Sequence, residues 1–157
     1  MSLSIIMGNM FSGKTSELIR RLKRLKVLGK DIIVVNSAKD TRSPDEVLKT
    51  HDNVKFNCHK VHDLFSLLDR DAFENADIVA IDEAQFFDNE IVAVCNDLAN
   101  RGIRVIVAGL DMDFKGNPFG PMPALMATAE YVTKVHAVCT HTGNLAHYSF
   151  RKAKNED

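Results

Sequence analysis

Short apolar runs alternate along this chain with longer stretches whose apolar residues repeat at helical spacing. The short runs predict buried strands at residues 3–7, 32–35, 76–81, 103–110 and 131–138. The helical repeats predict helices at residues 15–28, 62–68 and 91–100. Strands that alternate with helices pair in parallel through right-handed crossovers, so the pattern predicts an α/β fold whose parallel sheet has helices on both faces.

Two polar stretches interrupt this alternation. Residues 37–62 carry turn residues and scattered charges, which predicts a long excursion with at most one short strand, at 54–56. Residues 111–123 are rich in Gly and Pro but also hold two phenylalanines and two methionines. Apolar side chains on a loop need something to cover, so this second stretch must fold over either the core or a bound molecule.

The composition indicates one folded domain. The chain has 157 residues, of which 45% are hydrophobic and 26% charged, which excludes disordered, collagenous and coiled-coil classes. Its net charge of -1 provides no overall basic field for a nucleic-acid backbone. Six cations crowd the 15–28 helix and its exit: Arg20, Arg21, Lys23, Arg24, Lys26 and Lys30. The apolar stripe of that helix favours a solvated basic face, and a phosphate-facing role is the alternative.

The cysteines and the lack of long apolar windows indicate a cytoplasmic protein. Cys58, Cys95 and Cys139 are odd in number and far apart, which favours a reducing compartment over a disulfide framework. No window approaches the ~18 apolar residues of a membrane span. The polar glycine loop that begins at residue 8 comes too early for a secretory signal. From the apolar windows and this early loop together, we expect no association with a membrane.

The first predicted strand leads into a sequence that matches a phosphate-binding P-loop. The motif reads Gly8, Asn9, Met10, Phe11, Ser12, Gly13, Lys14 and Thr15. Its glycines let the backbone curl so that N–H groups and the positive end of the next helix face phosphate oxygens. Lys14 would reach the β- and γ-phosphates of ATP, and the Thr15 hydroxyl would bind Mg²⁺. A chance match is the alternative, but it gives no reason for the flanking strand and helix.

An acidic pair follows the 76–81 strand. In P-loop proteins a carboxylate at the end of a neighbouring strand supports Mg²⁺, and Asp82 has that position. Glu83 comes next, where its carboxylate would accept a proton from an attacking hydroxyl or water. A solvated cap at the strand end is the alternative interpretation. Together with the P-loop, the pair predicts a P-loop NTPase-like, RecA-like domain.

Two protein families have motifs similar to this P-loop and acidic pair. Asp82-Glu83-Ala84-Gln85 resembles a helicase box, but helicase motors need two such domains and this chain has the length of one. The chain more broadly resembles the cytosolic-type thymidine kinase family, from about residue 4 to residue 151. Blocks match in that family's order at residues 8–21, 40–42, 50–52, 81–87, 108–120 and 135–139. Many folds share a P-loop, whereas the later blocks together are specific.

The resemblance implies a reaction and a set of site residues. The reaction is transfer of the γ-phosphoryl of ATP to the 5′-hydroxyl of thymidine, a step of nucleotide salvage that uses Mg²⁺. The catalytic positions of the family are matched by Glu83 as general base, Lys14, Arg42 and Arg151, and its Mg²⁺ positions by Thr15 and Asp82. The residues that match its walls around thymine are Met10, Phe86, Leu110, Phe114 and Phe119. The family commonly forms dimers or tetramers, which implies a homo-oligomer.

The chain departs from the family near its C-terminal end. The family has a zinc lobe, and a tetrahedral zinc site needs four ligands. Here Cys139 is present, Thr142 stands at the second ligand position, and the sequence stops at residue 157 before a second pair. His141 and His147 would complete a three-ligand set with Cys139, but at a spacing that is not standard for structural zinc.

We therefore expect no zinc site and no lid over the base. The predicted organisation is a P-loop kinase domain at 1–135, followed at 136–157 by a remnant of the zinc and lid lobe with a flexible tail. Two other functions stay open. A catalytically impaired ATP-binding module, regulatory or for assembly, would explain the reduced lobe, whereas the intact Glu83 favours a kinase. A RecA-like ATPase acting on DNA would need a basic groove. The sequence offers no such groove beyond the basic residues of one helix.

Overall fold

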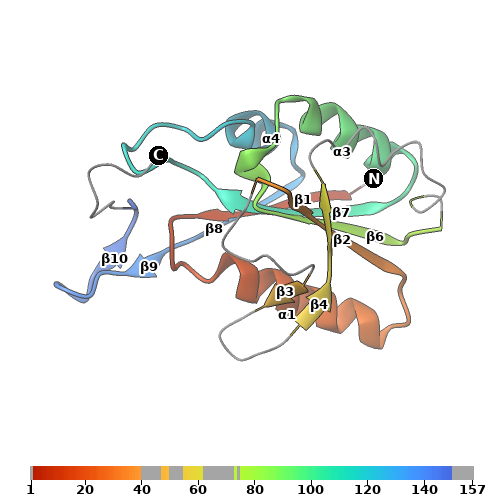
Figure 1. The fold of residues 1–157 in the computed structure, drawn as a ribbon, viewed down its shortest axis with the longest axis horizontal. Coiled ribbons are helices and arrows are strands. Elements are labelled where there is room, and N and C mark those ends of the chain that lie inside the picture. Colours follow the sequence, from red (N-terminus) through yellow and green to blue (C-terminus); the bar gives the residue numbers. More distant parts are fainter. Residues whose placement is uncertain (1, 40–46, 50–54, 62–72, 74, 150–157) are drawn as a thin grey trace.

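A sheet of six parallel strands forms the centre of the molecule (Figure 1). The computed structural model of the chain describes residues 2–39, 47–49, 55–61, 73 and 75–149. The strands lie in the order β5-β2-β6-β7-β1-β8, each parallel to its neighbours. Their bounds are β1 Ser2–Gly8, β2 Ile32–Ser37, β5 His59–Val61, β6 Ile78–Asp82, β7 Arg104–Leu110 and β8 Tyr131–Val135. Because all six are parallel, their carboxyl ends share one edge of the sheet.

Helices cover both faces of this sheet. In Figure 1, α1 (Lys14–Val27) lies on one face, and α3 (Glu90–Asn100) and α4 (Met122–Thr128) lie on the other. Successive strand residues point to opposite faces, so Ile6 packs in the apolar cluster under α1 and Met7 in the cluster under α3 and α4. In the described part of the chain, no helix is long and apolar enough to cross a bilayer.

The amphipathic pattern of α1 has the predicted consequence. Its apolar stripe is buried against the sheet through Leu18, Ile19 and Leu22. The exposed basic side chains on the helix and its exit are Arg20, Lys23, Arg24, Lys26 and Lys30. This agrees with the interpretation of these cations as a solvated face.

Shorter elements flank the main sheet. β3 (Val47–Lys49) pairs antiparallel with β4 (Lys55–Asn57), and β9 (Ala137–Val138) pairs antiparallel with β10 (Leu145–Ala146). A 3₁₀ turn, η2 (Ala84–Phe86), follows β6, with Glu83 as the one residue between them. In Figure 1 the β9–β10 hairpin extends beyond the carboxyl edge of the sheet.

The α/β fold with helices on both faces is confirmed, and so are most of its predicted elements. The confirmed predictions are the strands at 3–7, 32–35, 76–81 and 103–110, and the helices at 15–28 and 91–100. The predicted helix at 62–68 lies outside the described residues.

Three predictions need correction. The polar stretch 37–62 was expected to hold at most one short strand, but β3, β4 and β5 all lie in it. A single strand over 131–138 is wrong, because β8 ends at Val135 and β9 turns away to pair with β10. Residues 111–123 were interpreted as a loop, but α4 begins within this stretch at Met122, since prolines are tolerated in the first turn of a helix.

Candidate active site

The P-loop motif connects β1 to α1 at the carboxyl edge of the sheet. A Cβ on Gly8 would lie 2.2 Å from the Val135 carbonyl oxygen, so a side chain does not fit where β1 passes β8. Phe11 and Gly13 have positive φ values of 62° and 84°, which curl the loop back before α1 begins at Lys14. This curl is the shape that lets backbone N–H groups face phosphate oxygens.

The Lys14 ammonium lies over the curled loop. Its Nζ donates hydrogen bonds to the Asn9 carbonyl oxygen at 2.7 Å and to Ser12 Oγ at 3.4 Å. Phosphate oxygens carry negative charge that the Asn9 carbonyl and the Ser12 hydroxyl lack, so they would compete well for this ammonium. Lys14 therefore has the position that a phosphate-binding lysine requires.

Thr15 and Asp82 join the P-loop to β6. The Thr15 hydroxyl donates to Asp82 Oδ2 at 3.2 Å, although β7 lies between β1 and β6 in the sheet. Asp82 is 3% exposed. Burial first, and then the charge of Glu83, raise the pKa of Asp82 to about 7, while the Glu83 N–H, the Thr15 hydroxyl and Lys14 act in the opposite direction.

The oxygens of Thr15 and Asp82 fit Mg²⁺. This ion prefers oxygen ligands and is usually held by one or two carboxylates together with substrate phosphates and water. A bound divalent cation would favour the charged form of the Asp82 carboxylate, which burial disfavours. Within the described residues, no group of three or more His, Cys, Asp or Glu side chains could hold a metal ion. A Mg²⁺ ion that is shared with substrate phosphates does not need three such protein ligands.

Glu83 stands at the start of η2 with a strained backbone. Its φ and ψ of 52° and 42° are left-handed, and in the described chain Phe11 is the other non-glycine residue with positive φ. Its N–H donates to Asp82 Oδ1 at 2.9 Å, and its Oε2 accepts from Gln85 Nε2 at 2.6 Å. Such strain persists where the surroundings fix it and is frequent at functional sites. The half-buried Glu83 is thus held beside Asp82.

The structure brings some of the predicted thymine-binding residues together. The rings of Phe86 and Phe119 lie edge to face, with centroids 6.1 Å apart and planes at 82°. Leu110 ends β7 and is buried. Phe114 is 42% exposed, and its ring centroid lies 5.6 Å from Lys115 Nζ. Phe86 and Phe119 therefore form an apolar wall at the strand ends, whereas Phe114 lies at the surface.

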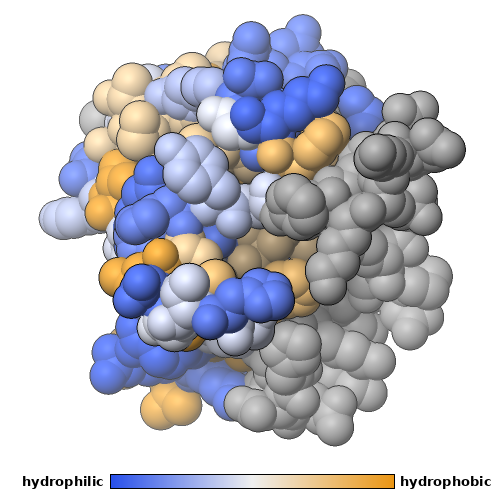
Figure 2. Space-filling model, turned by 90° about the vertical axis from the view of Figure 1, so that its left-hand side faces the viewer, coloured by the Kyte–Doolittle hydropathy of each residue, from blue (hydrophilic) through white to orange (hydrophobic). Residues whose placement is uncertain are grey.

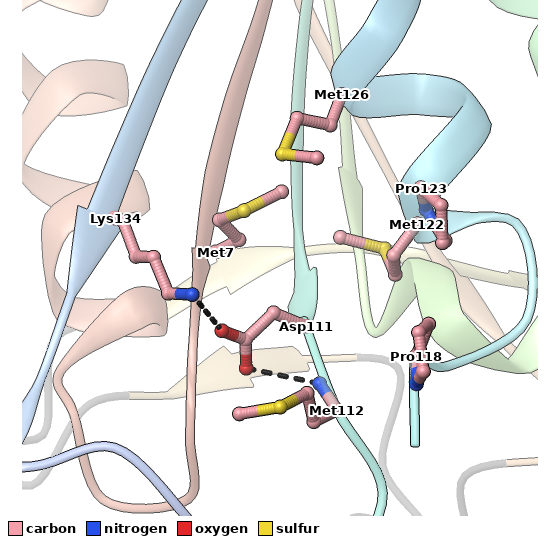
Figure 3. Close-up of a pocket in the computed structure, with 8 residues that line it drawn as sticks. All are labelled: Met7, Asp111, Met112, Pro118, Met122, Pro123, Met126 and Lys134. Atoms are coloured by element: carbon pink, nitrogen blue, oxygen red, sulfur yellow. Dashed lines mark hydrogen bonds and ion pairs between the residues drawn. The ribbon is translucent and has the colours of Figure 1, made fainter. Parts of the chain in front are cut away.

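A pocket of about 180 Å³ opens between α4, the ends of β1 and β8, and the loop after β7 (Figure 3). Its lining residues are Met7, Asp111, Met112, Pro118, Met122, Pro123, Met126 and Lys134. Figure 3 shows the methionine side chains around an ion pair in which Lys134 Nζ lies 3.0 Å from Asp111 Oδ2. None of the predicted thymine-binding residues lines this pocket. Figure 2, which faces the carboxyl edge, shows hydrophobic patches among hydrophilic side chains.

Hydrogen bonds tie the P-loop to the C-terminal segment. Asn9 is 4% exposed, its Oδ1 accepts from the Ala137 N–H at 3.1 Å, and its Nδ2 donates to the Tyr148 carbonyl oxygen at 3.4 Å. The Met10 N–H donates to Ser149 Oγ at 3.0 Å. The predicted boundary at residue 135 is therefore crossed by contacts from the P-loop.

Cys139 lies in the turn between β9 and β10. Its thiol is hydrogen-bonded by the Thr142 hydroxyl and by the N–H groups of His141 and Thr142, which lower the pKa of the thiol. His147 packs against His136, with ring centroids 4.4 Å apart. Among the described residues, Cys139, His141 and His147 do not form a group that could hold a metal ion.

Two contacts in the site were not predicted from the sequence, and two predicted site residues are not described by the structure. Arg42 and Arg151 lie outside the described residues. Gln85 was part of the matched block 81–87, but its contact with Glu83 was not predicted. Nothing in the sequence indicates that Asp111 pairs with a lysine of β8, because that contact depends on how β1 and β8 align.

Solved structures with a similar fold support the architecture. An ATPase aligns with 94% of this chain and 72% of its own, at 13% identity and a TM-score of 0.53. A DNA replication initiation factor aligns with 85% of this chain and 40% of its own, at 16% identity and a TM-score of 0.52. At such identities the likeness concerns the fold alone, which is the α/β P-loop fold predicted from the sequence.

Sequence comparison identifies the family. The family model described as thymidine kinase matches residues 1–157. A thymidine kinase of Bacteroides thetaiotaomicron is 50% identical over 155 residues, which are 98% of this chain and 76% of the relative. A thymidine kinase of Porphyromonas gingivalis is 45% identical over 155 residues, 99% of this chain and 75% of the relative. With a P-loop, an acidic pair at the end of β6 and these relatives, the chain belongs to the thymidine kinase family of enzymes.

Proposed function

We propose that the chain transfers the γ-phosphoryl group of ATP to the 5′-hydroxyl of thymidine, giving thymidine monophosphate and ADP. The observation that carries the proposal is the hydrogen bond from Thr15 to Asp82, because it joins the P-loop to the acidic pair that contains Glu83. A phosphate-binding loop, a metal-binding carboxylate and a second carboxylate thus meet at one edge of the sheet. Phosphoryl transfer asks a protein mainly to position groups and neutralise charge, which this set can do.

The residues divide the work between phosphates and nucleoside. The N–H groups of the P-loop and Lys14 hold the phosphates. Thr15 and Asp82 would hold Mg²⁺, which would supply further positive charge there. Glu83 accepts the proton of the 5′-hydroxyl as that oxygen bonds to the γ-phosphorus, and the bond from the γ-phosphorus to the oxygen of ADP breaks. Arg42 and Arg151 are proposed near the phosphates from the family resemblance.

The nucleoside base is proposed to bind against the apolar wall at the ends of the strands. Phe86 and Phe119 form the part of the wall with a defined ring contact. Leu110, Met10 and Phe114 complete the proposed set. Stacking of a flat base on an aromatic side chain is worth about 1–3 kcal/mol per base. Three other expectations also stay predictions. They are the domain division at residue 135, assembly as a dimer or tetramer, and the lack of bound zinc.

The proton acceptor is tested with Glu83→Gln and a matched control, Glu90→Gln, which changes an exposed glutamate at the start of α3. We expect Glu83→Gln to lower kcat by about 100-fold or more, since general base catalysis contributes about 10²–10⁴. The Kd of Mg-ATP, measured by calorimetry, should stay within about twofold for both variants, and Glu90→Gln should keep parental turnover. Parental turnover by Glu83→Gln would show that the base is assigned wrongly.

A further inference from the structure

Gln85 links the acidic pair to the end of β7. It lies in η2 and is 3% exposed. Its Nε2 donates to Glu83 Oε2 at 2.6 Å, and its Oε1 accepts from the Leu110 N–H at 3.1 Å. One buried amide therefore spans the distance between Glu83 and Leu110, the residue where β7 ends and the proposed base wall begins.

The orientation of this amide is fixed by its backbone partner. A backbone N–H can only donate, so the group that faces Leu110 must be the amide oxygen. The amide nitrogen then has to face Glu83, and it can donate only to an oxygen that has a lone pair to accept with. Gln85 therefore holds the Glu83 carboxyl group by an oxygen that carries no proton at the contact.

The surrounding chain leaves little room for another arrangement. A Cβ on Gly109 would lie 3.0 Å from Gln85 Oε1 and 2.8 Å from Met122 Sδ. A Cβ on Gly120 would lie 2.7 Å from the Gln85 carbonyl oxygen. Glycines from two different segments thus make space for Gln85, while the left-handed backbone of Glu83 needs neighbours that over-determine it.

We propose that Gln85 is a positioning residue: its amide fixes the Glu83 carboxylate relative to the end of β7, where the nucleoside base is proposed to bind. The role rests on the proposed function, in which Glu83 accepts the 5′-hydroxyl proton. The 5′-oxygen reaches Glu83 from a sugar whose base lies against the wall near Leu110. A link between these two points therefore sets how far the proton acceptor stands from the reacting oxygen.

The magnitude follows from the geometry that the reaction needs. A displacement of about 1 Å in a catalytic group can cost about 100-fold in rate. Gln85→Met keeps the length of the side chain but removes both hydrogen bonds. We expect it to lower kcat by about 10- to 100-fold, with the Kd of Mg-ATP and the KM of thymidine within about twofold of the parent.

The experiment is a double-mutant cycle on thymidine monophosphate formation with Glu83→Gln, Gln85→Met and the combined variant. Gln85 acts through Glu83, so Gln85→Met should lower kcat in the parent but change the residual rate of Glu83→Gln by less than about twofold. A purely structural Gln85 would lower both rates by the same factor, and that result would overturn the positioning role. Thermal unfolding and Mg-ATP binding confirm that each variant is folded.

Two further variants keep the test decisive. Gln85→Asn retains an amide on a shorter side chain that cannot span both partners, so it should give the same pattern if Gln85→Met fails to fold. Asp88→Asn, at an exposed position just after η2, should leave kcat unchanged. Parental turnover by Glu83→Gln would instead refute the proposed base, and the positioning role with it, so the two failures have different signatures.

Discussion

Asp82 combines near-complete burial with a negatively charged neighbour. Burial and Glu83 raise its pKa from an ordinary 3.8 to about 7. The folded protein therefore binds more protons than the unfolded chain between these values, and the metal-free protein loses stability as the pH rises through this window. A position that costs stability in this way fits a group whose purpose is to hold a cation.

Asp82→Asn should remove this dependence on pH. Because the neutral amide needs no proton, we expect the free energy of unfolding without Mg²⁺ to exceed that of the parent at pH 8 by about 2–4 kcal/mol, and to match it near pH 4. Urea unfolding with EDTA at both pH values measures this, with exposed Asp88→Asn as the control. A difference that is the same at pH 4 and pH 8 would contradict the pKa of Asp82.

At the scale of residues, the sequence predicts groups that lie in motifs and misses groups that act through distant partners. Lys14, Thr15 and Asp82 were predictable because each lies where a strand or helix begins or ends, and parallel strands align those ends. The role of Gln85 was not predictable, since its amide oxygen accepts a hydrogen bond from a backbone N–H 25 residues away. The same is true of Asn9, whose partner Ala137 is 128 residues away.

At the scale of elements, a charged cluster fastens α1 to the edge of the sheet. Glu17 accepts hydrogen bonds from Arg20 and Arg21, and Arg21 donates to Thr133 Oγ1 on β8 at 3.1 Å. The hydrogen bond from Arg20 above all, and that from Arg21, lower the pKa of Glu17 from 4.5 to about 2. The stabilisation from this carboxylate is therefore present above about pH 4.5 and is lost as the pH falls toward 2.

Glu17→Gln should lower the free energy of unfolding at pH 7 by about 0.5–1 kcal/mol, a value limited by the partial exposure of these side chains. The difference from the parent should shrink in 1 M salt and as the pH is lowered toward 2.5. Asp97→Asn, which breaks a half-exposed ion pair with Arg101 at the end of α3, is the control and should change stability by less than about 0.5 kcal/mol. A loss with Glu17→Gln that persisted at pH 2.5 would rule out the charge as its cause.

The elements that the sequence predicted well are those with a strong apolar period, such as β1, α1, β7 and α3. Short strands depend on pairing instead, and β5 forms because residues 59–61 meet β2. The sequence did not predict α4, because Gly120, Pro121 and Pro123 are typical of loops. Pro121 and Pro123 in fact lie at the start of the helix, where proline is tolerated. Strand β8 ends at Val135, and two residues later the Ala137 N–H donates to the Asn9 side chain of the P-loop.

At the scale of the whole molecule, Asn9 connects the phosphate-binding loop to the last part of the described chain. Replacement by alanine would leave the buried Ala137 N–H without its partner, which costs about 1–3 kcal/mol. We expect Asn9→Ala to lower the Tm by about 2–4 °C for each kcal/mol and to increase proteolysis between residues 137 and 149. Asn9→Asp keeps the acceptor for Ala137 and should lose less; an unchanged Tm for Asn9→Ala would show that the contact carries no stability.

The carboxyl edge of the sheet brings the proposed site residues together. β1 supplies the P-loop, β6 the acidic pair and β7 the start of the base wall, and all three end side by side because the strands are parallel. The family relationship covers the whole chain, which spans about three quarters of its relatives. Under the proposed function, this edge moves a phosphoryl group to a nucleoside rather than to water.

The most direct test follows the γ-phosphoryl group itself. The purified chain is incubated with Mg²⁺, γ-labelled ATP and thymidine, and the label is traced by chromatography, with and without added DNA. We expect one labelled thymidine monophosphate for each ADP formed, with no effect of DNA. Label released as inorganic phosphate in place of thymidine monophosphate, or ATP that is bound and never turned over, would contradict it.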